Sequence, residues 1–140
     1  MASKRPRFFH LMSLAQHRLL KSTDAAFKEE VGVSHTQLGV LWFLEKSPGA
    51  MLKDVSDELG INPSAITALI GRMEDAGLVR REFSDDDGRV AHIYATSQGL
   101  TKAAAARPVL AKLNARLMRD FNEKETAIIA RFLHSILEGF

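Results

Sequence analysis

The stretch that decides the fold runs from Leu52 to Arg81 and reads LKDVSDELGINPSAITALIGRMEDAGLVRR. Its first part has the pattern of a short helix that stops at Gly60. A second helical pattern begins after Asn62, a favoured N-cap, with Pro63 at the first helical position, where a missing N–H costs nothing. The three residues between the two patterns predict a helix-turn-helix, whose short connection often contains glycine.

The second helix of this unit has one apolar face, and a different pattern follows it. Its apolar residues recur at helical spacing: Ile66, Leu69, Ile70 and Met73. After Gly77, residues 78–83 and 90–96 are apolar and polar by turns, which predicts two short strands. We expect a β-hairpin, or wing, in which Gly88 relieves a tight turn with positive φ.

The rest of the chain predicts helices. The first covers about 8–30 and stops at Gly32, and the next follows a capping box formed by Ser34 and Gln37 and ends at 47–49. Two more helices finish the chain, one over about 97–121, kinked by Pro108, and one that starts at Asn122 with a capping-box spacing to Glu125. The predicted fold class is mainly α with a two-stranded β-wing.

Composition excludes several classes of function. The chain has 140 residues, 46% of them hydrophobic, which suits one globular domain over 1–140. It has no cysteine, so disulfides, thiolate metal sites and thiol redox sensing are excluded. No apolar run approaches the ~18 residues of a membrane span, no signal peptide is evident, and we expect a cytoplasmic protein. The net charge of +2 is only weak evidence for a polyanionic partner.

Enzyme and metal functions are not favoured. The sequence has no nucleophile elbow, no glycine loop to hold phosphates and no paired His-x-x-x-His spacing, so we do not expect an enzyme. The five histidines suggest exposed or hydrogen-bonded imidazoles rather than a metal site. No cofactor is expected.

Several short motifs, in order, resemble the MarR family of bacterial transcriptional regulators. They are the stretch 52–67, the stretch 69–81, the wing element Asp87-Gly88-Arg89 and the closing Thr96-Ser97-Gln98-Gly99. Each is weak alone, but together at these spacings they are specific. The resemblance covers essentially the whole chain and implies a winged helix-turn-helix over 34–96, with dimerisation helices at 8–30 and 97–140.

The resemblance also implies which residues contact DNA. The helix after Asn62 would enter the major groove, and Arg89 at the wing tip would enter the minor groove. Asp87 would hold the wing by pairing with Arg72 or Arg89. One of the pair Arg80 and Arg81 would touch phosphate, rather than merely charge a strand edge. The implied DNA-binding set is Asn62, Ser64, Ala65, Thr67, Ala68, Gly71, Arg72, Arg80, Arg81, Asp87 and Arg89.

This sequence departs from the family pattern at three places. Ala68 and Gly71 stand where larger polar side chains are common, so Ser64, Thr67 and DNA shape would carry more of the specificity. Three successive acids, 85–87, lie beside the wing tip and repel phosphate. Met51 stands where a capping Ser or Thr is common, so the helix after it would start loosely.

Apolar residues at both ends of the chain predict a homodimer, because one short helix does not need so much apolar surface for packing within its own chain. The predicted dimerisation residues are Phe8, Leu11, Leu117, Phe121, Ile129, Phe132, Leu133, Ile136 and Leu137. The resemblance further implies an effector site for a small aromatic or phenolic ligand. Its candidate lining residues are Phe9, Met12, His17 and Trp42, with Met12 and Trp42 as core residues in the alternative interpretation.

The predicted function is a dimeric repressor that binds a pseudo-palindromic operator in double-stranded DNA and is released by such a ligand. Two alternatives stay open: a DNA-binding regulator without an effector, and a protein-interaction module that uses the same fold. Substitution of Arg72 or Arg89 separates the last alternative from the others, because these residues matter only if DNA is bound.

Overall fold

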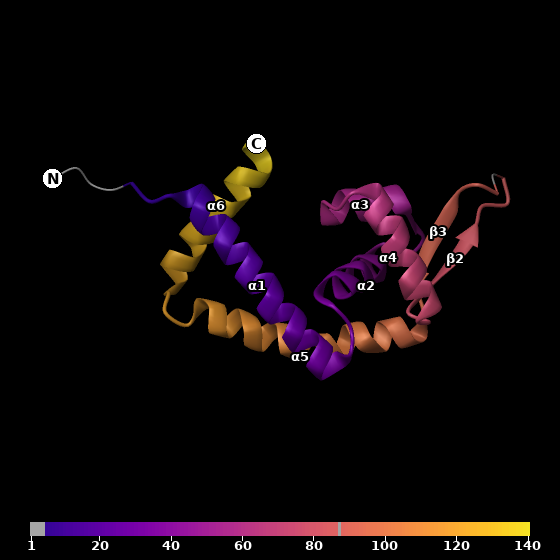
Figure 1. The fold of residues 1–140 in the computed structure, drawn as a ribbon, viewed down its shortest axis with the longest axis horizontal. Coiled ribbons are helices and arrows are strands. Elements are labelled where there is room, and N and C mark those ends of the chain that lie inside the picture. The colour runs from indigo at the N-terminus through magenta and orange to yellow at the C-terminus, as the bar shows by residue number, and fades with distance from the viewer. Residues whose placement is uncertain (1–4, 87) are drawn as a thin grey trace. The chain divides into compact units, whose positions relative to one another are not determined.

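A computed structural model describes residues 5–86 and 88–140. Nine elements follow one another along these residues (Figure 1). They are α1 Phe8–Val31, α2 His35–Lys46, β1 Ala50–Met51, α3 Leu52–Leu59, α4 Pro63–Asp75, β2 Val79–Phe83, β3 Ala91–Ala95, α5 Ser97–Met118 and α6 Glu123–Gly139. The chain divides into two compact units, one up to Arg107 and one from Pro108 onward, so the single domain over 1–140 stays a prediction.

The helix boundaries follow the capping signals of the sequence. The Ser34 hydroxyl accepts from Gln37 N at 3.1 Å and Gln37 Oε1 accepts from Ser34 N at 2.9 Å, which is the predicted capping box of α2. Asn122 and Glu125 form the same reciprocal pair at the start of α6. Gly32 ends α1 in the left-handed region with φ +79°, a conformation that costs glycine little.

The predicted two-stranded wing is confirmed as β2 and β3, and a third strand that the sequence did not predict joins its sheet. The strand order of the sheet is β1-β3-β2, with both pairs antiparallel. The additional strand, β1, pairs Ala50 with Ile93 and Met51 with His92. Two residues are too few to show an alternating pattern, so only the tertiary pairing with β3 defines this strand.

The core of the first unit is built from the apolar faces of its helices and of β3. The largest fully buried side chains are Phe27, Leu38, Leu41, Leu44, Ile66, Ile70, Met73, Ile93, Val40 and Val55. The four residues assigned to the inner face of α4 are all buried, as predicted. This packing fixes which side of α4 is left for solvent.

The start of α5 is tied to the turn that follows α4. The Thr96 hydroxyl donates to Gly77 O at 2.6 Å and accepts from Gly99 N at 3.1 Å, and Thr96 N donates to Leu78 O at 3.0 Å. A Cβ at Gly99 would lie 2.2 Å from Leu78 O, closer than atoms can approach. Glycine is therefore required where α5 crosses this turn.

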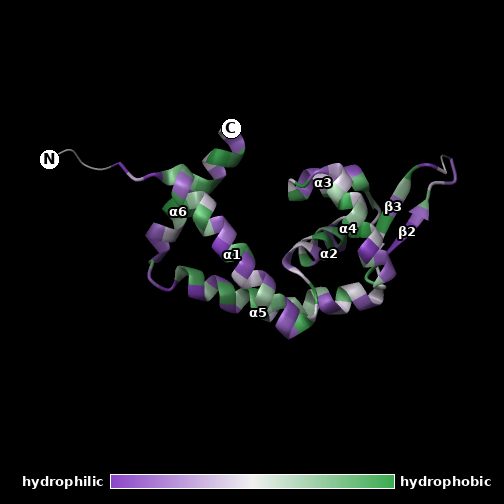
Figure 2. Ribbon diagram, viewed as in Figure 1, coloured by the Kyte–Doolittle hydropathy of each residue, from purple (hydrophilic) through white to green (hydrophobic). Residues whose placement is uncertain are grey.

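The second unit consists of α5 from Pro108 onward and α6. Pro108 lies inside α5, which continues to Met118, and the predicted kink there stays a prediction. No residue of α6 is buried, although apolar residues recur along it (Figure 2). Among the described residues, no helix is long and apolar enough to cross a lipid bilayer.

Candidate nucleic-acid interface

The turn between α3 and α4 is held by its own polar groups. Ile61 N donates to Ser56 O at 3.2 Å, and the Ser56 hydroxyl donates to Ile61 O at 2.5 Å. Asn62 then caps α4, because its Oδ1 accepts from Ser64 N at 2.9 Å. The helix-turn-helix predicted from the sequence is confirmed, with Gly60 in the left-handed conformation.

The opposite face of α4 is open to solvent. Ser64, Ala65, Thr67, Ala68 and Arg72 are exposed, while Gly71 is half-buried. These six residues share the face that the apolar residues leave free, as the sequence predicted. A second helix of a helix-turn-helix inserts such a face into the major groove.

The two hydroxyls on this face are already engaged as donors. The Ser64 hydroxyl donates to Asn62 Oδ1 at 2.7 Å, and the Thr67 hydroxyl donates to Pro63 O at 3.0 Å. A hydroxyl has one hydrogen to donate and two lone pairs that accept. In this state Ser64 and Thr67 present acceptors, not donors, to a partner.

The two arginines of β2 lie on opposite faces of the sheet, because successive residues of a strand alternate. Arg80 lies opposite Tyr94, with its guanidinium carbon 4.4 Å from the ring centroid, and forms an ion pair with Glu82. Arg81 lies opposite the buried Ile93 and therefore shares the face of β2 that packs against α4. The sequence alone left open which of the two accompanies the recognition helix.

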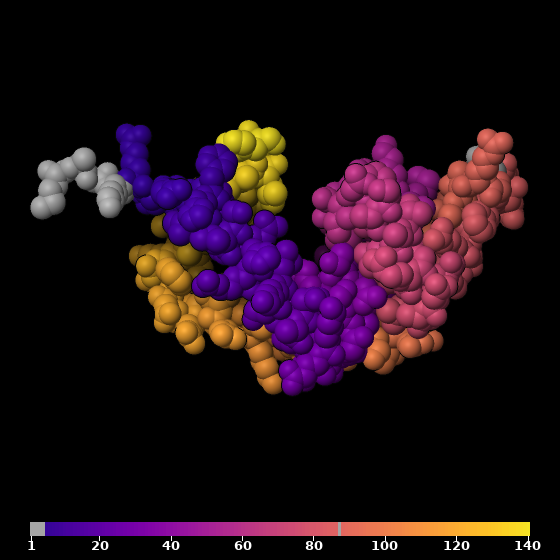
Figure 3. Space-filling model, viewed as in Figure 1, coloured from indigo at the N-terminus to yellow at the C-terminus, as the bar shows by residue number. Residues whose placement is uncertain are grey.

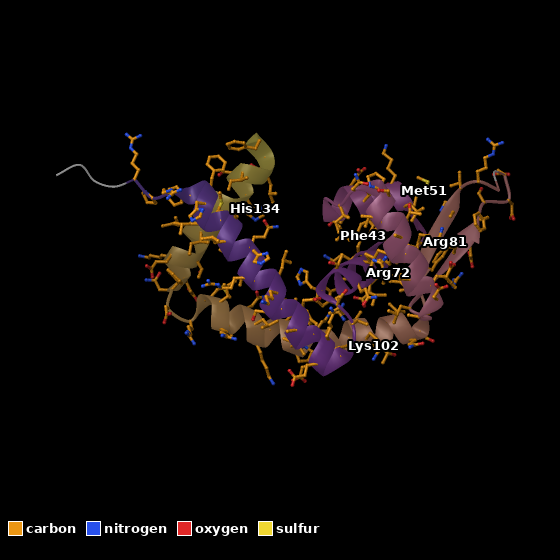
Figure 4. All side chains as sticks on the ribbon, in the orientation of Figure 1. Phe43, Met51, Arg72, Arg81, Lys102 and His134 are labelled. Carbon is orange, nitrogen blue, oxygen red and sulfur yellow. The ribbon has the colours of Figure 1, made fainter. Side chains whose placement is uncertain are left out.

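Arg81 contacts α4 directly (Figure 4). Its Nε lies 3.4 Å from Glu74 Oε1, and its Nη2 lies 3.9 Å from the position of a Cβ on Gly71. The Nε is buried and makes no hydrogen bond of good geometry within the described residues. Glu74 could not be predicted from the sequence, because its contact with Arg81 depends on the turn after α4 and has no signature in local spacing.

The wing projects beyond the body formed by α3 and α4 (Figure 3). Arg89, Asp85 and Asp86 are exposed near its tip. The pairing of the two strands extends as far as Ser84, whose N donates to Val90 O at 2.9 Å. Asp87 lies outside the described residues, so its pairing with Arg72 or Arg89 and the turn at Gly88 stay predictions. Exposed Arg89 nonetheless agrees with a wing that offers a cation to a partner.

The helix α3 begins more firmly than its sequence predicted. Met51 supplies no side-chain cap, but Asp54 Oδ2 accepts from Met51 N at 3.0 Å. A carboxylate in the first turn also interacts favourably with the helix dipole. The expectation of a loose start overlooked this half of a capping box.

The four predicted ligand residues are not all brought together in one chain. The Trp42 ring lies edge-on to Phe27, with centroids 6.0 Å apart, and its Nε1 donates to Ala103 O at 3.1 Å. Phe9 is 79% exposed and lies about 27 Å along α1 from Phe27 at ~1.5 Å per residue. His17, also exposed, lies about 15 Å from Phe27 on the same basis. One small ligand therefore cannot touch both Phe9 and Trp42 within one protomer.

Met12 and Trp42 are half-buried, so neither is a fully buried core residue in this chain. A second aromatic contact adjoins Trp42: Phe27 also lies 6.0 Å from the His35 ring. His35 Nδ1 lies 3.4 Å from the Thr23 hydroxyl, and His35 N donates to Asp24 Oδ1 at 2.9 Å. The buried Phe27 thus joins the rings of Trp42 and His35 at the junction of α1 and α2.

The residues predicted for dimerisation are exposed, with Ile136 half-buried. On α6 the exposed fractions are 42% for Ile129, 40% for Phe132 and 49% for Leu133. Large apolar side chains at this exposure on one helix are unusual for a monomer. Within the residues that the structure describes, no cluster of His, Cys, Asp and Glu could hold a metal ion.

Comparison with known proteins agrees with this geometry. Residues 31–90 match the model of the MarR family. The HTH-type transcriptional repressor Rv2887 of Mycobacterium tuberculosis is 26% identical over 125 residues, covering 84% of this chain and 90% of the relative.

Two solved structures share the fold. The Staphylococcus aureus MepR–DNA complex superposes with a TM-score of 0.88 at 18% identity, covering 97% of this chain and 100% of that one. The PcaV regulator of Streptomyces coelicolor, solved with its natural ligand, gives a TM-score of 0.80 at 22% identity and 99% coverage of both chains. The match over residues 31–90 places this segment in the MarR family, and the relative and the fold make the chain as a whole similar to MarR-family regulators.

Proposed function

We propose that this protein is a dimeric, sequence-specific DNA-binding repressor that works in the cytoplasm and releases its operator when a small aromatic or phenolic ligand binds. The observation that carries the proposal is the outward face of α4. The side chains of this face are small and uncharged over the first two turns of α4, and the exposed Arg72 follows further along the helix. The face lies between the capped turn after α3 and the wing, on which Arg89 is exposed. The relative Rv2887 is named a transcriptional repressor, and the similar MepR fold was solved with DNA.

Two groups of residues in the proposed interface supply different kinds of contact with DNA. The residues at the start of α4, from Asn62 to Ala68, are proposed to meet base edges, where small side chains allow close approach. Arg72 and Arg80 are proposed to neutralise phosphates, and Arg89 to enter the minor groove. Asp87 is proposed to steady the wing. Its neighbours Asp85 and Asp86 are exposed and lower the affinity for phosphate.

Dimerisation is proposed because an operator half-site alone gives limited affinity. A twofold pair of α4 helices about one helical turn apart, ~34 Å, matches a pseudo-palindromic operator. The apolar residues of α1, of the end of α5 and of α6 are the proposed contact surface. Burying them removes apolar area from water at roughly 25 cal/mol per Å².

The ligand is proposed to bind more tightly to one of two arrangements of the dimer, which differ in the distance between the two α4 helices. Only such a difference in affinity can shift a two-state equilibrium. Trp42 is the proposed aromatic wall of the ligand site, and His17 is the α1 candidate nearest to it along the helix. Met12 lies about 22 Å along α1 from Phe27 at ~1.5 Å per residue, so it is too distant to join Trp42 within one protomer. Phe9 is too distant along α1 to join Trp42 within one protomer. The similar fold of PcaV was solved with a natural ligand, which supports a ligand site in this fold.

A direct test uses fluorescence anisotropy with DNA from upstream of the protein's own gene, measured over a salt series. Tight binding to one segment, with log K falling linearly against log salt, is expected. Arg72→Ala and Arg89→Ala should weaken binding at least tenfold without lowering the melting temperature by more than a few degrees. Arg131→Ala on α6 is the matched control.

The protein-interaction alternative predicts the opposite result. A module that binds only protein would show no sequence-dependent anisotropy change and no effect of Arg72→Ala or Arg89→Ala. The ligand component is tested separately, by a thermal-shift screen of aromatic carboxylates and phenols. Hits should lower operator affinity, and Trp42→Leu should remove their effect. If no compound shifts the melting temperature, the effector-free alternative is favoured.

A further inference from the structure

The outward face of α4 is short of hydrogen-bond donors. Ala65, Ala68 and Gly71 have no polar side chain, and the hydroxyls of Ser64 and Thr67 donate to oxygens of their own helix start. In the major groove guanine presents two acceptors, N7 and O6, which need donors on the protein. Between residues 64 and 72, only Arg72 carries a side-chain donor that is not committed to the N-terminal turn.

A second donor reaches this face from the neighbouring strand. The Nη2 of Arg81 lies 3.9 Å from where a Cβ of Gly71 would be, an ordinary contact distance. Gly71 follows Ser64 and Ala68 by seven and three residues, so the three lie on one stripe of the helix. The Arg81 guanidinium is therefore placed against the outward face at the half-buried Gly71, the position where α4 has no side chain.

Glu74 holds this guanidinium in place. Its Oε1 lies 3.4 Å from Arg81 Nε, which is buried, while the Arg81 side chain as a whole is 22% exposed. Because Nε faces the Glu74 carboxylate, the two Nη groups, which form the fork of the planar guanidinium, are the donors left for a partner. Such a fork is planar and loses little freedom when it binds, in contrast to a flexible lysine.

We propose that Arg81 is a specificity-determining residue that reads a guanine in the major groove through the space left by Gly71, with Glu74 as its positioning residue. The inference rests on the proposed function and extends it from α4 to β2. A bidentate arginine on O6 and N7 is the commonest specific contact to guanine. The small side chains of α4 are then complemented by an arginine from the strand beside it.

The position of Arg81 favours a base over a phosphate. Its Nη2 lies against Gly71, which shares a stripe with Ser64 and Ala68 on the side of α4 opposite its buried residues. Arg80 shows the contrasting arrangement, since it faces away from α4 and lies over Tyr94. Base edges are read by side chains that enter the groove, whereas contacts to phosphates position the protein on the duplex.

The test begins with selection of binding sites from random duplex DNA by the full-length protein. Affinities are then measured for every single-base change of the selected site. We expect one guanine in each half-site whose replacement weakens wild-type binding about tenfold or more. Arg81→Ala should abolish the discrimination at that position and leave the other positions unchanged. Arg81→Lys, which keeps the charge but not the fork, should also lose it.

A variant at Gly71 tests the same geometry without touching the arginine. Gly71→Leu adds an apolar side chain where Nη2 lies and should remove the same guanine preference as Arg81→Ala. Gly71→Ala, whose Cβ would be in ordinary contact with Nη2, should disturb it much less. Glu74→Gln should weaken the preference at that base pair and no other. Circular dichroism melting curves confirm that each variant is folded.

Two results overturn the inference. If Arg81→Ala retains the guanine preference, Arg81 does not read a base. If Arg81→Ala instead weakens all sequences equally, lowers the salt slope by about one and is restored by Arg81→Lys, Arg81 is a phosphate contact. Arg80→Ala is the comparison for that behaviour, since it should leave every base preference in place. A wild-type protein that enriches no sequence would refute the proposed function itself.

Discussion

Lys102 Nζ donates to Val31 O at 2.7 Å, so a cation of α5 caps the last turn of α1 from 71 residues away in sequence (Figure 4). Val31 is the final residue of α1, where carbonyl groups lack partners within the helix and the dipole favours positive charge. The first half of α5 is therefore fastened at two places, to the end of α1 by Lys102 and to the turn after α4 by Thr96.

Replacing this cation should destabilise the first unit. Lys102→Met keeps most of the aliphatic chain but removes the donor and the charge, and we expect a loss of about 1 to 2 kcal/mol in the free energy of unfolding. Urea unfolding followed by circular dichroism measures it. Lys53→Met, at an exposed lysine of α3, is the control and should change little. Equal effects of both substitutions would contradict the capping role.

Asp24 should make stability depend on acid pH. The backbone N–H of His35 and the ammonium of Lys28 lower the pKa of its carboxyl below the ordinary value of 3.8. A lowered folded-state pKa means that the stabilisation is present above about pH 4 and is lost as the pH falls through the folded-state value.

Asp24→Ala should therefore reduce stability at pH 7 by about 1 kcal/mol, for a partly exposed charged hydrogen bond. The difference between the variant and the wild type should shrink toward pH 3. Denaturant titrations at both pH values measure this, with Glu29→Ala on the same helix as control. A difference that stays constant down to pH 3 would show that the carboxylate charge is not involved.

Met51 offers a substitution that should stabilise the protein. It occupies the N-cap of α3 with extended backbone (φ −84°, ψ 161°), while Asp54 already accepts from its N–H. Met51→Ser adds a hydroxyl oxygen that accepts from the backbone N–H of Asp54, which completes the capping box. We expect a gain of about 0.5 to 1 kcal/mol, read as a higher melting temperature. Met51→Ala, which cannot cap, should show no gain.

The apolar face of α6 should control oligomeric state. Phe132→Glu places a charge among large exposed apolar residues, and a buried unpaired charge is strongly unfavourable. Sedimentation analysis should show a monomer at concentrations where the wild type is a dimer, with a corresponding loss of operator binding. Arg131→Glu, on the opposite side of α6, is the control. A wild type that sediments as a monomer at all concentrations would refute the dimer.

The sequence predicted those parts of the fold that depend on local chemistry. It placed the N-caps at Ser34, Asn62 and Asn122 and the helix ends at Gly32 and Gly60, because each of these signals lies within a few neighbouring residues. The outward residues of α4 followed from helical spacing. The alternating pattern after Gly77 predicted the wing, and the family resemblance added the role of Arg89 at its tip.

The remaining features depend on contacts between distant segments. Strand β1 exists only through pairing with β3, and the Trp42 Nε1 bond to Ala103 O joins residues 61 positions apart. Nothing in their spacing predicts these contacts. The same is true of Arg81, whose position against Gly71 is set by the direction of β2 after α4, so that sequence analysis could not choose between Arg80 and Arg81.

The glycine at position 99 gives α5 a fixed pivot. With a backbone oxygen where any side chain would begin, α5 and the turn after α4 meet in one register and cannot slide past each other. The start of α5 therefore moves together with the turn that follows α4.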